Sequence, residues 1–315
     1  MIALEEITAA RARIAGPVLR TPLVQLQVPE ARAEIYLKLE NLQPIGSFKL
    51  RGALNAILQI PEAELADGVV TASAGNMGQG VAWAARELGV RSTVVVPDGA
   101  AETKVAAIER LGGEVVKVPY EQWWDAIATS STSAAPGRFV HPVEDEAVMA
   151  GNGTIGLEIL EDLPDADAIL VPYGGGGLSV GIASAIRALD PTVPVYAVEP
   201  EPAAALTASL AAGEPCEVEG TPSFVDGSGS PRVLPKMWPL AREVLNGAFA
   251  VPVDDAADAV RLLVNRARIV AEGAGALATA AALAGRAGSG KVVAIVSGGN
   301  IDEAKLGTIL SGGTP

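Results

Sequence analysis

The sequence predicts an α/β fold built on parallel sheets, and three observations lead to this prediction. Short apolar runs of strand length alternate along the chain with segments of helical periodicity. Two strand–glycine loop–helix units, near residues 68–98 and 167–199, stand in the two halves of the chain. With 315 residues, of which 49 % are hydrophobic and 19 % charged, the chain is long enough for two domains with large cores.

The first half of the chain contains the expected elements in strict alternation. Strands are predicted at residues 35–40, 68–73, 92–97 and 114–119. Helices are predicted at residues 7–16, 50–58, 81–89 and 102–112. The third helix should end at Gly89, because glycine favours the position just after a helix. The segment SAGNMGQG, residues 73–80, is predicted to be a loop.

The second half repeats the same alternation. Strands are predicted at residues 166–173, 193–200 and 291–296, and helices at residues 178–189 and 255–272. The segment SSTSAAPG, residues 130–137, is either a linker or a surface loop. We expect a large domain formed by residues 1–67 with 146–315, and a smaller mobile domain formed by residues 68–145.

Composition excludes several classes of function. The net charge of −14 makes nucleic acid a poor partner, because the protein would repel phosphate backbones. The single cysteine, Cys216, cannot form a disulfide framework or a cysteine metal site. The N-terminus has no apolar signal core, and the longest uncharged run, residues 168–186, is interrupted by Pro172 and four glycines. A cytoplasmic protein with no membrane span is therefore expected.

The chain has one histidine, His141, which precedes a proline in a predicted loop. Ser-His-Asp triads need a histidine base, and most catalytic zinc sites need more than one histidine. If the protein is an enzyme, we expect its proton chemistry to depend on lysine, on carboxylates or on a cofactor.

The most informative motif is the glycine run Gly174–Gly177, between a strand and a helix. Four residues without side chains can direct several backbone N–H groups at one anion, and the helix N-terminus adds positive charge. This pattern predicts a phosphate site, with a flexible turn as the alternative. A dinucleotide site is less favoured because the G-x-G-x-x-G spacing is not met, although Glu199 lies where a ribose ligand would.

A second motif, GSFKLRGA, places Lys49 just before a predicted helix. The positive end of that helix would lower the pKa of the amine and make it a nucleophile. The alternative is a solvated surface lysine, and this motif alone does not decide between them.

Two further loops follow strands. Ser73–Gly80 could bind a carboxylate through its N–H groups and its Ser73 and Asn76 side chains, or Ser73 could simply cap a helix. Ser297–Asn300 ends the last strand, where ligands bind in open α/β sheets, although an ordinary turn is the alternative. Together the four motifs supply an amine, a phosphate site, a carboxylate site and a hydroxyl.

The motifs GSFKLRGA, SAGNMGQG, PYGGGGLSVG, EGAGA and SGGN, in this order, resemble the threonine/serine dehydratase family of fold-type II pyridoxal-phosphate enzymes. Residues 141–159 and 197–200 also match, and the resemblance extends from about Thr21 to about Asp302. It implies two open twisted-sheet domains of the tryptophan synthase β type, with pyridoxal 5′-phosphate in the cleft between them.

The resemblance also implies a role for each motif. Lys49 would form a Schiff base with the cofactor and remove the Cα proton. Phe48 and Asn76 would flank the pyridine ring, and Ser297 would hydrogen-bond its nitrogen, with Glu272 nearby. The phosphate would be held by Gly174, Gly175, Gly176, Gly177 and Leu178. The substrate carboxylate would be held by Ser73, Gly75 and Asn76.

The chain departs from the family pattern at four positions. Ala74 stands where racemases of the family carry a serine acid, which argues against racemisation. Met77 replaces the usual histidine and Asn152 a common glutamine, which leaves the substrate open. Ala205 replaces the aspartate of cation-binding relatives, so a divalent cation near Glu199 and Ala203 is disfavoured and no metal site is predicted.

These features predict a lyase that acts by β-elimination on a small amino-acid substrate, a 3-hydroxy amino acid such as L-threonine or L-serine, and gives a 2-oxo acid and ammonia. The alternatives are β-replacement or elimination on another amino acid with the same cofactor, a nucleotide-dependent oxidoreductase, and a non-catalytic binding protein. A homodimer is the family expectation. Because the chain ends after the catalytic region, feedback control through a further domain is not expected. Residues Ser223–Val233 would either line the substrate pocket or form a surface loop.

Overall fold

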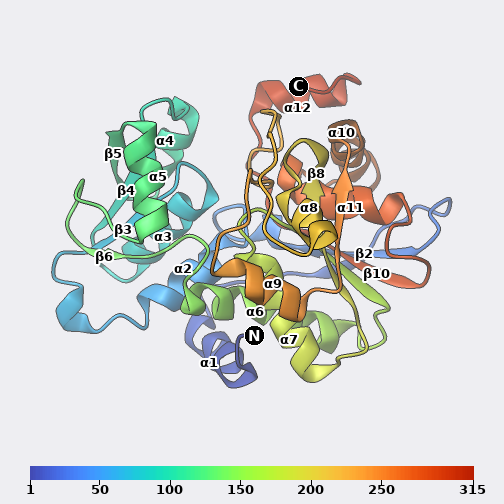
Figure 1. The fold of residues 1–315 in the computed structure, drawn as a ribbon, viewed down its shortest axis with the longest axis horizontal. Helices are drawn as coiled ribbons and strands as arrows, with labels where there is room; N and C mark the ends of the chain where they lie inside the picture. The colour runs from blue at the N-terminus through green and yellow to red at the C-terminus, as the bar shows by residue number, and fades with distance from the viewer.

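A computed structural model describes all residues from 1 to 315, arranged around two sheets (Figure 1). The larger sheet has the order β1-β2-β10-β7-β8-β9, and only β1 runs antiparallel to its neighbour. Its strands are β1 (Leu23–Gln25), β2 (Glu34–Leu39), β10 (Lys291–Val296), β7 (Ala168–Pro172), β8 (Val195–Pro200) and β9 (Ala248–Val251). The chain therefore has the predicted α/β fold, because helices connect the parallel strands on both sheets.

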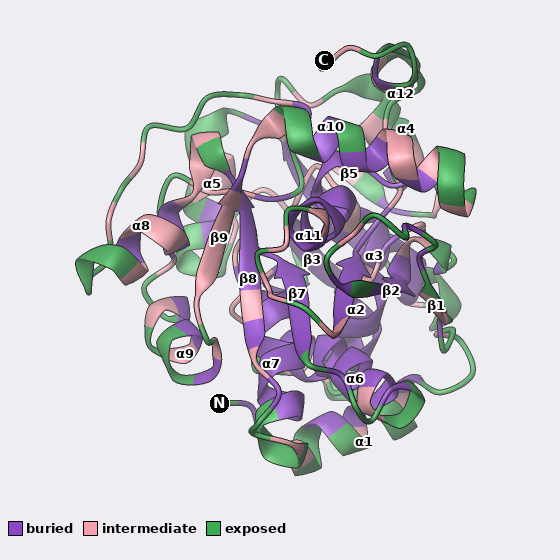
Figure 2. Ribbon diagram, turned by 90° about the vertical axis from the view of Figure 1, so that its right-hand side faces the viewer, coloured by how far each residue is buried: buried purple, intermediate pink, exposed green.

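The central strands of the larger sheet are buried on both faces (Figure 2). Alternate residues of β7 belong to different apolar clusters: Ile169 and Val171 to one, Ala168 and Leu170 to the other. This alternation follows from the two-residue period of a pleated strand. One face is covered by α1 (Leu4–Ile14), α6 (Glu146–Asp162), α7 (Gly177–Leu189) and α9 (Met237–Val244). The other is covered by α10 (Val253–Leu262) and α11 (Gly273–Leu283), and Ile309 of α12 (Glu303–Leu310) belongs to the same apolar cluster. Helix α8 (Ala205–Ala212) contributes Ala205 and Leu206 to the cluster on the first face.

The smaller sheet is parallel throughout and has the order β5-β4-β3-β6. Its strands are β5 (Glu114–Val118), β4 (Ser92–Pro97), β3 (Val69–Ala72) and β6 (Arg138–Phe139). Helices α3 (Asn76–Glu87) and α4 (Glu102–Arg110) pack on one face, and α5 (Tyr120–Thr129) packs on the other. In Figure 1 this unit lies on the left, and α2 (Lys49–Ile57) lies between it and the larger sheet.

Among the predicted helices, the boundaries differ most at the start of α3 and at the end of α10. Helix α3 begins at Asn76, so only the first residues of the predicted loop 73–80 are irregular. The helix predicted for residues 255–272 ends earlier, because α10 passes into a π-helical turn at Leu263–Ala267. Arg268 then takes a left-handed backbone conformation with φ 62°, so residues 269–272 leave the helix. None of the helices is both long and apolar enough to span a bilayer.

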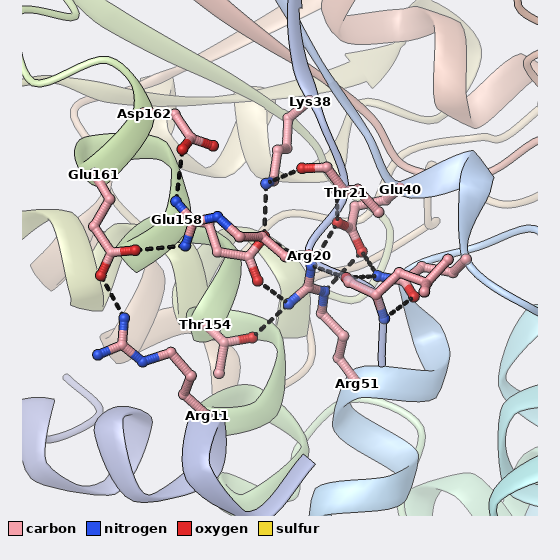
Figure 3. A network of polar contacts seen from close by, with 12 residues as sticks. Arg11, Arg20, Thr21, Lys38, Glu40, Arg51, Thr154, Glu158, Glu161 and Asp162 are labelled. Carbon is pink, nitrogen blue, oxygen red and sulfur yellow. Dashed lines mark hydrogen bonds and ion pairs between the residues drawn. The ribbon is translucent and has the colours of Figure 1, made fainter. Parts of the chain in front are cut away.

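A buried ion network fixes α2 between the larger sheet and α6 (Figure 3). The Arg51 guanidinium, 1 % exposed, donates to Glu40 at 2.8 Å and to Glu158 at 2.7 Å. Lys38 forms a second ion pair with Glu158 at 2.6 Å and donates to the Thr21 carbonyl. Two cations therefore balance two carboxylates in the interior, which is the condition for tolerating buried charge.

Helices α2 and α6 approach closely because glycines stand at their crossing. A Cβ atom at Gly151 would lie 2.5 Å from the Arg51 carbonyl oxygen, and one at Gly52 would lie 2.7 Å from the Val148 carbonyl oxygen. Real Cβ atoms do not come so close to backbone oxygen, so larger residues would push the helices apart. Lys49 is the first residue of α2, the helix held by this crossing.

Candidate active site

A cavity of about 310 Å³ lies between the two sheets. It receives the carboxyl ends of β3, β7 and β10 and the loops that follow them, the usual position of a ligand site in an open α/β sheet. All the residues predicted to bind cofactor or substrate line it: Phe48, Lys49, Ser73, Gly75, Asn76, Gly174, Gly175, Gly176, Gly177, Leu178 and Ser297. The structure thus brings together four motifs that lie far apart in the sequence.

The lysine motif and the last strand are joined directly through their backbones. Ser47 and Gly298 form an isolated antiparallel bridge. The Phe48 N–H donates to the Ser297 carbonyl at 3.0 Å, and the Gly299 N–H donates to the Gly46 carbonyl at 2.9 Å. These bonds set Lys49 and the Ser297 side chain against the same cavity.

Lys49 is the first residue of α2, and its side chain is half-buried. The ammonium group donates to the Pro142 carbonyl at 3.1 Å and lies 5.2 Å from the centre of the Phe48 ring. Burial lowers the pKa of Lys49 to about 8, against the opposing effect of the Glu272 carboxylate. The sequence predicted a lowered pKa from the helix end; in the structure the main cause is burial. A lysine with this pKa is partly neutral near neutral pH and can act as a nucleophile or a base.

Asn76 and Glu272 form a hydrogen-bonded chain at the edge of the cavity. The Asn76 amide donates to Glu272 Oε1 at 2.8 Å and accepts from the Asn300 amide at 2.8 Å. Burial raises the pKa of Glu272 to about 7, helped by the Asp226 carboxylate and opposed by the bond from Asn76. Glu272 therefore changes its charge close to neutral pH.

The glycine run enters α7, whose first residue is Gly177. The N–H groups of Gly174, Gly175 and Gly176 make no hydrogen bond within the protein and are free to bind an anion. Gly176 has φ 102°, and a Cβ atom there would lie 2.9 Å from the Tyr173 ring, while one at Gly175 would clash with Val143. Backbone donors without partners, glycines that cannot be replaced and a helix N-terminus together match a phosphate group.

The first turn of α3 also leaves backbone N–H groups without partners beside the cavity. Its N-cap residue is Gly75, and no side chain caps the helix. The Ser73 hydroxyl instead accepts from the Gly75 N–H at 3.3 Å and lines the cavity. Ser73 therefore does not cap the helix, and the free N–H groups at its start can bind a carboxylate.

Of the residues at the mouth of the cavity, the sequence did not single out Lys104 or Trp123, whereas Asp226 belongs to the segment Ser223–Val233, which was one alternative for the pocket wall. Lys104 of α4 forms an ion pair at 2.7 Å with Asp226, from the loop before α9, and Trp123 of α5 also lines the cavity. Part of the segment Ser223–Val233 forms the cavity wall, through Asp226, Gly227 and Ser228. Lys104 and Asp226 are 122 residues apart, and no local pattern signals their pairing.

Glu199, the residue considered as a ribose or cation ligand, is buried outside this cavity. Its carboxylate accepts hydrogen bonds from the Leu206 N–H at 2.9 Å and the Thr207 N–H at 2.8 Å, and also from the Thr207 hydroxyl. Burial raises its pKa. Its partners are therefore the first turn of α8 and a threonine side chain.

Comparisons with known proteins agree with this geometry. Residues 14–298 match the family described as pyridoxal-phosphate dependent enzymes. The chain is 42 % identical to an L-threonine ammonia-lyase of Thermotoga maritima, over 99 % of this chain and 79 % of that protein. It is 40 % identical to the catabolic L-threonine dehydratase of Escherichia coli, over 98 % and 96 %.

A solved pyridoxal 5′-phosphate-dependent aspartate racemase has a similar structure, with 34 % identity and a TM-score of 0.87. The similarity covers 97 % of this chain and 98 % of the racemase. The sequence matches and the structural match both extend over nearly the whole chain. The chain belongs to the family of pyridoxal-phosphate-dependent enzymes.

Proposed function

We propose that this enzyme is an ammonia-lyase that converts a 3-hydroxy amino acid, such as L-threonine or L-serine, into a 2-oxo acid and ammonia. The observation that carries the proposal is the position of Lys49. Its amine, with a pKa of about 8, lies in one cavity with a glycine phosphate site and the uncapped N-terminus of α3. The names of the two relatives, an ammonia-lyase and a dehydratase, support the same reaction.

The residues present fit pyridoxal phosphate. The free N–H groups of Gly174–Gly176 and the start of α7 would hold the phosphate. The Lys49 amine would bind the aldehyde carbon, Phe48 and Asn76 would lie beside the ring, and the Ser297 hydroxyl would face the ring nitrogen. When bound, the cofactor supplies an electron-withdrawing ring that stabilises negative charge at the substrate Cα.

The substrate carboxylate would bind at the start of α3. Ser73, Gly75 and Asn76 offer a hydroxyl, backbone N–H groups and the positive end of a helix of 12 residues. These donors come from the smaller sheet, whereas Lys49 and Ser297 are held by the larger one. The substrate would therefore bridge the two units.

Lys49 is the group best placed to remove the Cα proton. The other ionisable side chains that line the cavity are Lys104, Asp226 and Glu272. Lys104 and Asp226 neutralise each other at 2.7 Å, and Glu272 is hydrogen-bonded to Asn76. Ala74 lines the cavity without an ionisable group, so it offers no second acid for racemisation. A single base favours elimination of the 3-hydroxyl group.

We also propose that residues 68–145 move as a unit and close over the substrate, while residues 1–67 and 146–315 stay together. The carboxylate site lies on the moving unit, and the Lys104–Asp226 ion pair links the two units at the mouth. Closure would exclude water from the cavity during the reaction.

Two measurements test the proposal. Borohydride reduction of the holoenzyme followed by peptide mapping should place the cofactor mass on Lys49 alone; attachment to another lysine would overturn the assignment. Purified holoenzyme should release 2-oxo acid from L-threonine or L-serine. If the cofactor is bound but none of a panel of 3-hydroxy amino acids gives a 2-oxo acid, the ammonia-lyase proposal is overturned in favour of another reaction of the family. The buried apolar side chain of Met77 in the cavity wall favours including β-replacement substrates in that panel.

A further inference from the structure

The only histidine of the chain lies directly behind the cavity wall. His141 is 4 % exposed and does not line the cavity. Its Nε2 lies 3.0 Å from the Ile127 carbonyl oxygen, so this nitrogen carries the proton and donates. Its Nδ1 accepts from the Val143 N–H at 3.0 Å and the Glu144 N–H at 2.7 Å. The neutral ring therefore folds residues 141–144 around itself and ties them to α5.

The loop held by His141 contacts the site in two places. The Pro142 carbonyl accepts the hydrogen bond from Lys49 Nζ at 3.1 Å. The Val143 side chain occupies the space that a Cβ atom at Gly175 would need. The Val143 carbonyl oxygen would lie 2.9 Å from a Cβ atom at Gly177. One short loop therefore contacts both the reactive amine and the glycine phosphate site.

We propose that His141 is a positioning residue that fixes the Pro142–Val143 loop between Lys49 and the glycine phosphate site, and so sets the affinity for the cofactor. The proposal rests on the proposed role of Lys49 and Gly174–Gly177 in binding pyridoxal phosphate. It requires the Nδ1 acceptor in particular, because two backbone N–H groups of the loop have no other partner than this nitrogen.

Burial favours the neutral form of His141, and the two nearby carboxylates oppose it. Burial lowers the pKa of His141, against the opposing effects of Glu144, the bond to Ile127 and Asp145. Glu144 lies 3.9 Å from Nε2 and is itself 3.8 Å from Lys236, whose charge also lowers the pKa of His141. Protonation of Nδ1 would replace the acceptor with a donor and release the loop.

Three variants separate this role from simple packing. Asparagine places an oxygen near the position of Nδ1, so His141→Asn keeps the acceptor for Val143 and Glu144. Glutamine reaches the position of Nε2, so His141→Gln keeps only the donor to Ile127. His141→Phe fills the volume and keeps neither. The affinity of each apoprotein for pyridoxal 5′-phosphate is measured by titration, with the midpoint of thermal unfolding as the measure of stability.

We expect His141→Asn to bind the cofactor within about threefold of the wild type, and His141→Gln and His141→Phe to bind it about tenfold or more weakly, the effect of losing two hydrogen bonds. The KM for the amino-acid substrate at saturating cofactor should change less than the cofactor affinity. The proposal is overturned if all three variants bind pyridoxal 5′-phosphate with the same affinity. It is also overturned if the loss of cofactor affinity correlates with the loss of thermal stability and not with the loss of the Nδ1 acceptor. Cofactor titration needs no turnover, so failure of the ammonia-lyase proposal would leave this result readable.

Discussion

Replacing Arg51 by methionine should destabilise the protein strongly, because it leaves two buried carboxylates with one cation. Arg51 is 1 % exposed, Glu40 is 0 % exposed and Glu158 is 5 % exposed. After the substitution, Lys38 still pairs with Glu158 at 2.6 Å, but no cation contacts Glu40 within the distance of an ion pair. Breaking a buried pair by removing one partner costs about 3–5 kcal/mol, so Arg51→Met should lower the free energy of unfolding by about that amount.

The loss should depend on pH in a defined direction. Burial alone would raise the pKa of Glu40, but the charge and hydrogen bonds of Arg51 hold it below its usual 4.5. In the wild type this carboxylate therefore stabilises the fold above the unfolded pKa, and the contribution is lost as the pH falls through the folded pKa. In Arg51→Met the pKa is raised instead, so acid protonates Glu40 and relieves the cost. The difference in the free energy of unfolding between the wild type and Arg51→Met should be largest near neutral pH and should become smaller toward acid pH.

Urea unfolding at several pH values measures both effects. The matched control is Arg20→Ala, because Arg20 also pairs with two carboxylates, Glu161 and Asp162, but its side chain is 47 % exposed. An exposed pair contributes only about 0.2–1 kcal/mol, so this variant should unfold nearly as the wild type does. The reasoning about the buried network would be refuted if Arg51→Met lost no more free energy of unfolding than Arg20→Ala. It would also be refuted if Arg51→Met lost more free energy of unfolding at acid pH than at neutral pH.

Three further predictions concern the site. In the wild type we expect kcat/KM to fall below about pH 7, because the ionised Glu272 carboxylate, with a pKa of about 7, holds Asn76 most firmly. Glu272→Gln should flatten this fall. If the pH profile of kcat/KM is the same in Glu272→Gln and the wild type, the role given to Glu272 is contradicted. The same raised pKa of Glu272 should make the free energy of unfolding of the wild type fall as the pH rises from 4.5 to 7. Gly176→Ala should weaken cofactor binding about tenfold or more, whereas Gly16→Ala, with a similar φ of 100° and open space around it, should not; equal effects would mean that backbone strain alone is responsible. Lys104→Ala and Asp226→Asn should each raise KM with less than about 1 kcal/mol lost in stability, and the double variant should be no worse than either single one; additive losses in KM would argue against a link across the mouth.

The sequence predicted the parts of the fold whose patterns are local. Strand β4 was predicted over the residues it occupies, because STVVVP is a short run rich in β-branched residues between turns. The α/β class, the family and the cofactor are confirmed by the fold and the comparisons. The helix predicted for residues 255–272 was wrong at its end, since its apolar periodicity continues past the point where the π-helical turn stops it. Short strands such as β6, with two residues, carry no readable pattern of their own.

The candidate site was readable where one motif contains its own chemistry. The glycine run and the lysine motif could be singled out because their residue types are unusual for ordinary turns. The residues that contact these two motifs and adjust their properties could not be singled out, because they come together only in the fold. Pro142 lies 93 residues from Lys49, and Glu272 lies 196 residues from Asn76. The pKa of Lys49 was predicted in the right direction for the wrong main cause, because burial is not visible in a local sequence.

The central claim is that Lys49 is both the cofactor anchor and the base of an elimination. The most direct test is steady-state release of 2-oxo acid from L-threonine by the wild-type holoenzyme and by Lys49→Ala reconstituted with pyridoxal 5′-phosphate. The account predicts turnover by the wild type and a loss of at least about a thousandfold in kcat for the variant, as expected when an essential base is removed. Full turnover by Lys49→Ala would contradict it.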